Sequence, residues 1–195
     1  MARSTREAIL TATAELMRQK GYAAVGMKDI VAASGAPVGS LYHHFRGGKV
    51  QIAREALVNA GVAYGLLIPA LMSGYEDLGE AIEGVFAQAA EDMTTTGFAN
   101  MCPVGTVAAE TVEELRVTAA GVFSSWLDGG AAYFEGRGLP AELAREVTVA
   151  IIGALEGAFI LARTLRDVEP LLVAGRTLGR PYRGVSLRDP AAVAR

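Results

Sequence analysis

Apolar residues recur at intervals of three and four along most of the chain, and this spacing predicts an all-α protein. Residues 4–20 show the pattern first, with Ile9 and Met17 on one side of the helix. Further helices are predicted over residues 49–67, 77–95, 103–109, 112–136, 140–166 and 168–178. Pro69 and Ser73-Gly74 are expected to end or kink the first of these, because proline lacks the N–H group that a helix interior needs.

Residues 27–49 predict two short helices joined by a tight turn. One face of the first helix consists of Ile30, Val31 and Ala33. The Ser34-Gly35 pair ends this helix, since glycine tolerates the left-handed conformation that closes helices, and Pro37 suits the first turn of the next. Two helices joined in this way form the helix-turn-helix pattern. An ordinary helical hairpin is commoner in proteins at large and stays open on this evidence.

The second of these helices divides into two faces. Val38, Leu41 and Phe45 lie three and four residues apart and are expected to pack inward. The other face carries small residues, an aromatic ring and an imidazole: Gly39, Ser40, Tyr42 and His43. Lys28, Arg46 and Lys49 flank it. This face has the features of a DNA reader, in which the helix enters the major groove and the flanking cations contact phosphates.

Charge is distributed unevenly along the 195-residue chain. The net charge of −3 by itself argues against nucleic acid. Residues 1–49, however, hold seven basic and three acidic residues, a net charge of +4, and the other 146 residues carry a net charge of −7. A basic head on an acidic body fits a protein that contacts DNA with one end only.

The N-terminal motifs resemble those of tetracycline-repressor-like (TetR family) regulators. The shared residues are Gly21-Tyr22, Met27-Lys28-Asp29-Ile30, Gly35, Gly39-Ser40-Leu41-Tyr42-His43-His44-Phe45 and Lys49. The resemblance implies an all-α fold with an N-terminal three-helix helix-turn-helix DNA-binding domain, followed by a larger helical ligand-binding and dimerisation domain. It also implies that residues 38–40, 42 and 43 lie on the recognition helix, and that Tyr42 and Lys49 contact phosphates.

Two positions depart from the family pattern. The family often has Thr-Ser just before the second helix, where Val25-Gly26 stands here, so a side-chain N-cap and a hydroxyl contact to phosphate are missing. A lysine is frequent where Val38 stands, so one groove contact is missing as well. The expected DNA-binding residues are Lys28, Val38, Gly39, Ser40, Tyr42, His43, Arg46 and Lys49.

The second half of the chain resembles one branch of the same family, the lincomycin-resistance repressors that control drug efflux. The matching motifs are Met101-Cys102-Pro103-Val104-Gly105, Trp126, Ala154-Leu155-Glu156-Gly157-Ala158, Ala162-Arg163, Arg166-Asp167 and Pro170-Leu171. This resemblance implies a ligand-responsive repressor. Methionine and aromatic side chains suit an adaptable apolar pocket, although each is individually commoner as plain core. The expected effector-binding residues are Phe86, Met93, Phe98, Met101, Phe123, Trp126 and Phe159.

Three segments are predicted along the chain. Residues 1–48 bind DNA, residues 49–180 bind the effector and dimerise, and residues 181–195 form a flexible tail, because Arg, Gly and Pro are frequent there and periodicity is lost. Small residues form one stripe of the penultimate helix: Ala150, Gly153, Ala154, Gly157 and Ala158. The stripe is wider than the core of one chain needs, so a homodimer through the last two helices, about residues 140–178, is predicted.

The sequence offers little for catalysis. His43 and His44 are adjacent, so they point about 100° apart on a helix and cannot chelate one metal ion together. One is expected to pack inward near Phe45 and the other to face the groove. Cys102 is the single cysteine, which excludes an internal disulfide, and no histidine outside the head can activate it. The chain is therefore predicted not to be an enzyme and to need no cofactor or metal.

The remaining patterns bear on location. No long uncharged apolar run is flanked like a membrane span, and the N-terminus lacks the apolar segment of a signal peptide, so a cytoplasmic protein without a membrane partner is expected. The predicted function is a ligand-responsive transcriptional regulator, specifically a repressor released from a palindromic double-stranded DNA operator by a small apolar effector. The alternative is a helical small-molecule-binding protein or enzyme-like domain whose basic head has no specific operator.

Overall fold

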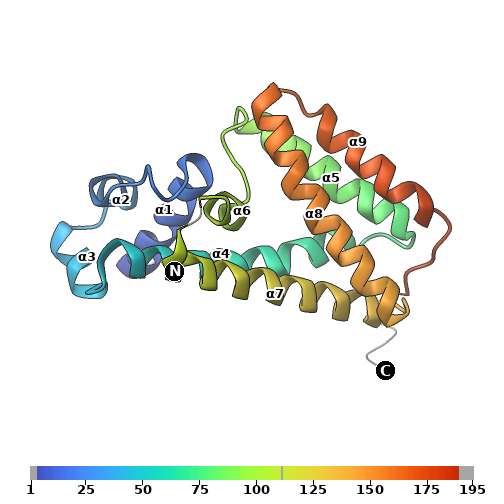
Figure 1. The fold of residues 1–195 in the computed structure, drawn as a ribbon, viewed down its shortest axis with the longest axis horizontal. Helices are drawn as coiled ribbons and strands as arrows, with labels where there is room; N and C mark the ends of the chain where they lie inside the picture. Colours follow the sequence, from blue (N-terminus) through green and yellow to red (C-terminus); the bar gives the residue numbers. More distant parts are fainter. Residues whose placement is uncertain (1–3, 111, 189–195) are drawn as a thin grey trace. The chain divides into compact units, whose positions relative to one another are not determined.

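The structure is a computed structural model that describes residues 4–110 and 112–188, and in this part of the chain it is almost entirely helical (Figure 1). Its helices are α1 (Thr5–Lys20), α2 (Met27–Ser34), α3 (Val38–His44), α4 (Gly48–Met72), α5 (Leu78–Thr95), α6 (Pro103–Ala108), α7 (Glu113–Gly136), α8 (Ala141–Leu165), α9 (Glu169–Gly179) and the 3-10 helix η1 (Arg180–Tyr182). The all-α prediction is confirmed. Most helix ends lie within one residue of their predicted positions, with α4 as the main exception.

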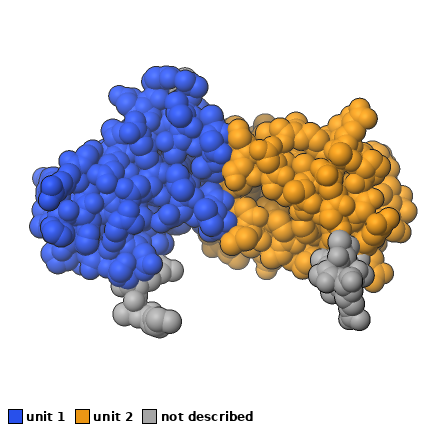
Figure 2. Space-filling model, turned by 90° about the horizontal axis from the view of Figure 1, so that it is seen from below, with its two compact units in different colours: residues 1–63, 100–123 blue, residues 64–99, 124–195 orange. Residues whose placement is uncertain are grey.

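Figure 2 distinguishes two compact units. Unit 1 comprises residues 1–63 and 100–123, and unit 2 comprises residues 64–99 and 124–195. Both α4 and α7 begin in unit 1 and end in unit 2, so two continuous helices connect them.

Unit 1 is built around a small apolar core under α1, α2 and α3. α1 packs against both α2 and α6, and α6 lies beside α1 in Figure 1. The most deeply buried side chains are Ile9, Leu10, Met17, Ile30, Leu41, Phe45, Ile52 and Leu57. Ser4 fixes the start of α1 with a capping box, since its hydroxyl accepts a hydrogen bond from the Glu7 N–H (3.2 Å) and its own N–H donates to the Glu7 carboxylate (3.0 Å).

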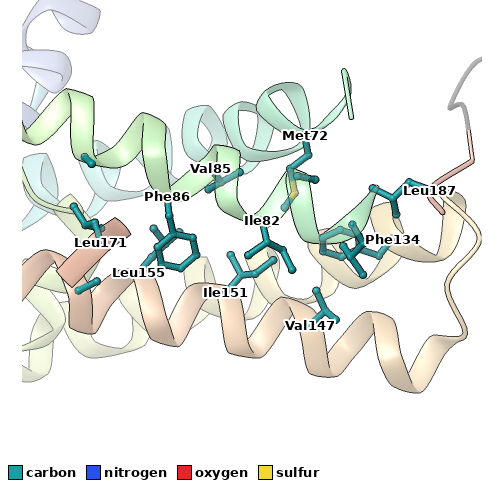
Figure 3. Close-up of a cluster of buried hydrophobic side chains, with 14 of the residues drawn as sticks. Met72, Ile82, Val85, Phe86, Phe134, Val147, Ile151, Leu155, Leu171 and Leu187 are labelled. Atoms are coloured by element: carbon teal, nitrogen blue, oxygen red, sulfur yellow. The ribbon is translucent and has the colours of Figure 1, made fainter. Parts of the chain in front are cut away.

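Unit 2 has the larger core, formed by α5, α8 and α9 with the ends of α4 and α7. Figure 3 shows Ile82 and Phe86 of α5 directed toward Ile151 and Leu155 of α8. α9 packs closely on α5 and also contacts α8. The cluster is continuous from Met72 to Leu187, so this unit has a single apolar interior.

The first difference from the sequence analysis is the length of α4. The helix continues through Pro69 to Met72 instead of ending near residue 67. A proline inside a helix costs about 3 kcal/mol. Met72 is fully buried, and Ile68 and Leu71 pack against the same core, so apolar burial offsets that cost at about 1.5–3 kcal/mol for each fully buried side chain.

The second difference concerns the predicted flexible tail. Residues 181–188 are packed on unit 2, and residues 189–195 lie outside the described part of the chain. The Val185 carbonyl accepts a hydrogen bond from the Leu78 N–H (2.9 Å), and the Leu187 side chain is buried in the core. Arg137, only 2% exposed, adds three more bonds: its guanidinium donates to the Tyr133 hydroxyl, to the Tyr75 carbonyl and to the Arg188 carbonyl. Loss of helical periodicity therefore marks irregular packed backbone here.

Two helices, α4 and α8, are long and apolar enough to cross a membrane by length and composition alone. Such a pair is weak evidence, because core helices of other proteins meet the same criterion. In unit 2, α8 buries Val147, Ile151 and Leu155 against other helices, which accounts for part of its apolar character.

Candidate nucleic-acid interface

The helix-turn-helix consists of α2, a three-residue turn and α3. Gly35 ends α2 in the left-handed conformation (φ 65°, ψ 9°), with its N–H bonded to the Val31 carbonyl. Pro37 then precedes the first residue of α3, as the sequence predicts. The first helix, α2, buries Ile30 completely and Val31 partly, whereas Ala33 is exposed. The inner face of α2 is therefore narrower in the structure than the sequence predicts.

Leu41 and Phe45 anchor α3, since both side chains are completely buried. The prediction that Val38 packs with them is wrong, because this side chain is 55% exposed. Val38 is the first residue of a seven-residue helix, and it extends past the edge of the small core. Its exposure leaves it on the surface that the DNA-binding hypothesis requires.

The exposed face of α3 carries the residues proposed to read DNA. Tyr42 is 59% exposed, Gly39 and His43 are exposed, and Ser40 is half-buried. A methyl group at Gly39 would meet no atom within 4 Å, so this position is open to an approaching backbone. The structure therefore brings Val38, Gly39, Tyr42 and His43 together on one accessible surface of unit 1.

The two histidines do not divide as predicted. Both rings are exposed, with their centroids 5.3 Å apart, and the His44 ring lies 6.3 Å from that of Phe45 at the protein surface. At 100° per residue, neither position falls on the face defined by Leu41 and Phe45, so neither imidazole can pack inward. Both imidazoles are thus accessible at the protein surface.

The start of α2 lacks a side-chain cap, as predicted from Val25-Gly26. Gly26 is the N-cap residue, and it makes no side-chain cap hydrogen bond. Its own N–H donates to the Asp29 carboxylate at 2.7 Å. Lys28, in the first turn of α2, is exposed, and so is Arg46 after α3. These two cations lie in the sequence on either side of the reading helix.

Lys49 makes two contacts within unit 1. Its ammonium lies 4.1 Å from the centroid of the Tyr22 ring and donates a hydrogen bond to the Ala23 carbonyl at 3.5 Å. Partial burial lowers the pKa of Lys49, and the charges of Glu110 and Asp29 oppose that shift. Burial also raises the pKa of Tyr22, with the charge of Glu114 as the next cause. Lys49 is the second residue of α4, where a helix N-terminus favours an anion.

Two further residues contribute to this surface, and sequence patterns alone do not identify their roles. Arg6 pairs with Glu55 and lies over the Phe45 ring, 5.4 Å from its centroid. Glu110 accepts hydrogen bonds from the N–H groups of Tyr22 (2.6 Å) and Ala23 (2.7 Å). No local pattern identifies these partners, because 49 residues separate the first pair and 88 and 87 separate the second.

The residues predicted to bind an effector fall into two sets. Met101 and Phe123 belong to unit 1, where both are half-buried. The other five belong to unit 2: Phe86 and Met93 are completely buried, and Phe98, Trp126 and Phe159 are half-buried. Phe86 and Met93 pack in the core cluster, and Phe98 and Phe159 pack against it. The Trp126 ring lies 6.2 Å from that of Tyr64.

The backbone near Phe98 is unusual. Phe98 adopts φ 63° and Arg166 adopts φ 58°, a region that few residues other than glycine occupy. The Arg166 guanidinium lies 5.7 Å from the centroid of the Phe98 ring and donates a hydrogen bond to the Gly97 carbonyl at 3.3 Å. These contacts hold the end of α8 against the chain that follows α5.

Cys102 behaves as a buried structural thiol. It is the N-cap residue of α6, where its sulfur accepts a hydrogen bond from the Gly105 N–H at 3.3 Å. Among the described residues, no group of three or more His, Cys, Asp or Glu side chains has a geometry that suits a metal ion.

The family models that match the two parts of the chain both describe regulatory proteins. The family model for bacterial regulatory proteins of the tetR family matches residues 9–56. The model for the C-terminal domain of LmrA/YxaF-like transcriptional regulators matches residues 79–177.

Whole-chain relatives point the same way. The chain is 35% identical over 181 residues to the HTH-type transcriptional regulator Rv0196 of Mycobacterium tuberculosis, covering 89% of this chain and 91% of the relative. It is 36% identical over 172 residues to the HTH-type regulator YxaF of Bacillus subtilis, covering 87% and 90%. A crystal structure of the regulatory protein TetR from Rhodobacter sphaeroides superposes with a TM-score of 0.78 at 25% identity, covering 90% of this chain and 97% of that one.

These relatives are regulators of transcription and not enzymes, which confirms that prediction from the sequence. The chain belongs to the TetR family of bacterial transcriptional regulators, with a C-terminal domain of the LmrA/YxaF-like type.

Proposed function

We propose that this regulator is a cytoplasmic repressor that binds a palindromic operator as a homodimer and leaves it when a small apolar effector binds. The observation that carries the proposal is the exposed face of α3, where Tyr42 and His43 project from a helix fixed by Leu41 and Phe45. A rigid helix with an accessible polar face fits the major groove.

Each exposed residue has a distinct task in this proposal. Ser40, His43 and the backbone at Gly39 read base edges, because a small residue permits close approach and an imidazole can donate or accept a hydrogen bond. Tyr42, Lys28, Arg46 and Lys49 contact phosphates and set the register of the helix in the groove. The cations among them make affinity depend on salt, since each neutralised phosphate releases counterions.

Exposed aliphatic residues of α8 and α9 support the homodimer. On α8, Val149, Gly153, Gly157 and Ile160 lie within about 80° of one another at 100° per residue, and Ile160 is 53% exposed. Leu172 and Val173 are exposed on α9. The small-residue stripe divides, because Ala158 is buried in the core and Ala154 packs against it, whereas Gly153 and Gly157 face outward. An apolar strip of this kind is typical of a subunit contact.

Each unit offers one feature that an effector could use, and the two features are independent of each other. Phe98, Trp126 and Phe159 are half-buried aromatic side chains of unit 2 that a ligand could contact by small rotamer changes. In unit 1, the Oδ1 atom of Asn100, a residue only 7% exposed, has no hydrogen-bond partner among the described residues. A buried acceptor without a donor is costly, and a ligand hydroxyl or N–H group would satisfy it.

Release of the repressor from its operator then requires the effector to bind the DNA-free state more tightly than the DNA-bound state. About 3 kcal/mol of coupling between the two binding events changes operator affinity roughly 150-fold.

The test is a titration of the purified protein against a fluorescent duplex of its own upstream intergenic DNA, at two salt concentrations, with and without random competitor DNA. The proposal expects saturable binding that survives the competitor, with a stoichiometry of one dimer per site. Binding that the competitor removes completely would favour the alternative, a helical ligand-binding protein whose basic head has no specific operator at that sequence.

A further inference from the structure

Glu110 connects two segments of unit 1 that are far apart in the sequence. It follows α6, and its two carboxylate oxygens accept hydrogen bonds from the consecutive N–H groups of Tyr22 (2.6 Å) and Ala23 (2.7 Å). Both N–H groups lie just beyond the end of α1, where the turn to α2 offers them no helical partner. A charged acceptor on two N–H groups makes stronger hydrogen bonds than a neutral acceptor does.

The backbone at Gly21 is shaped for this carboxylate. Gly21 adopts φ 80°, and a Cβ atom at this position would lie 1.9 Å from Oε1 of Glu110. Any other residue at position 21 would therefore displace the Glu110 side chain. A second contact ties the same end of α1 to the segment before α6, since the Arg18 Nε–H donates to the Met101 carbonyl at 3.2 Å.

The peptide that Glu110 holds is the one that positions Lys49. The Tyr22 ring lies under the Lys49 ammonium, and the Ala23 carbonyl accepts its hydrogen bond. Ala23 thus donates to Glu110 on one side and accepts from Lys49 on the other. The charge of Glu110 also acts directly on Lys49, where it favours the ammonium form and raises the pKa against the effect of burial.

We infer that Glu110 is a positioning residue for DNA binding, which holds the Tyr22–Ala23 peptide so that the Lys49 ammonium is fixed at the start of α4. This inference rests on the proposed function, in which Lys49 contacts a phosphate. It assigns to Glu110, just beyond the end of α6, an indirect part in operator affinity through the position of Lys49.

The inference reverses the sign expected from charge alone. Removing an acidic residue beside a DNA-binding surface normally strengthens binding, because it removes repulsion from phosphate. Here Glu110→Gln should weaken operator binding about tenfold, since an NH2 group, which cannot accept, replaces one of the two oxygens that each accept one N–H, and Lys49 loses its fixed position. The salt dependence should also become shallower, by up to about 0.9 in log–log slope, if the Lys49 contact is lost.

Two variants distinguish the effect of the position of the Glu110 carboxylate from the effect of its charge. Glu110→Asp keeps the charge but is one methylene shorter, so it should weaken binding in the same direction. Glu114→Gln removes the same charge from an exposed carboxylate in the first turn of α7 and serves as the matched control. Its operator affinity should equal or exceed that of the wild type. Far-UV circular dichroism melts establish that each variant is folded.

The decisive experiment is a double-mutant cycle between Glu110→Gln and Lys49→Gln, measured by fluorescence anisotropy on an operator duplex that the wild type binds specifically. If Glu110 acts through Lys49, the change at residue 110 costs less than about twofold once Lys49 is absent. An undiminished loss in the Lys49→Gln background, or tighter binding by Glu110→Gln alone, would overturn the inference. Failure of the wild type itself to bind any duplex specifically would instead overturn the proposed function.

Discussion

The recognition helix α3 and the long helix α8 present opposite kinds of surface. α3 has seven residues, buries Leu41 and Phe45, and exposes Tyr42 and His43. α8 has 25 residues, buries Val147, Ile151 and Leu155, and exposes aliphatic residues such as Ile160. A polar aromatic face can exchange water for base edges and phosphates, whereas an aliphatic face gains most by meeting another aliphatic face. This difference supports the proposal that α3 contacts DNA and that α8 contributes to a subunit interface.

The largest effect is expected from a charge on the exposed aliphatic strip of α8. Ile160→Glu should convert the dimer to a monomer and weaken operator binding more than about 100-fold, because the two half-sites would no longer be bound together. Sedimentation velocity measures the first change and anisotropy measures the second. Val117→Glu, at an exposed valine of α7, is the matched control. A dimeric Ile160→Glu protein would contradict the assignment of this surface.

The next effect concerns the stability of unit 2. Arg137→Met should lower the free energy of unfolding by about 3 kcal/mol, because the Tyr75 and Arg188 carbonyls and the Tyr133 hydroxyl each lose a donor. Urea denaturation followed by circular dichroism measures this change. Arg188→Ala should have little effect, since Arg188 contributes its backbone N–H and carbonyl to the contact. Equal stability of Arg137→Met and wild type would show that the guanidinium does not hold the C-terminal segment.

A smaller effect should distinguish the two exposed histidines of α3. His43→Ala should relax the preference at one base pair of each half-site by about 1–3 kcal/mol while leaving other positions unchanged. Competition with a set of singly substituted duplexes measures this preference. His44→Ala, next to it in the sequence and also exposed, is the control and should leave the preference intact. A uniform loss across all duplexes would make His43 a backbone contact.

The smallest effect is a dependence of stability on pH at the start of α5. Hydrogen bonds from the N–H groups of Glu80 (2.9 Å) and Gly184 (2.6 Å), the Glu80 bond foremost, lower the pKa of Asp77. A carboxylate with a lowered pKa contributes stability above its ordinary pKa, and this contribution is lost as the pH falls through the lowered value. Asp77→Asn should therefore have a lower urea midpoint than wild type at pH 7. The difference should shrink on acidification, and an unchanged difference would exclude the carboxylate charge as its cause.

Much of the fold follows from local signals in the sequence. Gly35 and Pro37 mark the turn, and Leu41 with Phe45 marks the inner face of α3, because these features depend on residues a few positions apart. Periodicity wrongly predicts an inward Val38, because it gives an angle around a helix but not the edge of the core. The continuation of α4 past Pro69 depends on burial of Met72 in the core of unit 2, which includes residues of α8 and α9 that lie far from α4 in the sequence.

The contacts that support the DNA surface are harder to predict. In the sequence, nothing distinguishes Glu110 from an ordinary acidic residue that follows a short helix. Only the fold brings it to the N–H groups of Tyr22 and Ala23. The segment of residues 181–188 has no helical period, yet Leu187 is buried and the backbone is hydrogen bonded to α5 and to the chain around it. In both cases the information lies in residues that are 50 or more positions apart, which local patterns do not contain.

Footprinting of the wild-type protein on its operator fragment tests the central claim most directly. Two recognition helices related by a two-fold axis should protect two symmetric half-sites whose centres lie about 10–10.5 base pairs, or a multiple of that spacing, apart on the duplex. Methylation of guanines in the major groove of each half-site should block binding. A single asymmetric protected segment, or no protection at saturating protein, would contradict a dimer that reads DNA with α3.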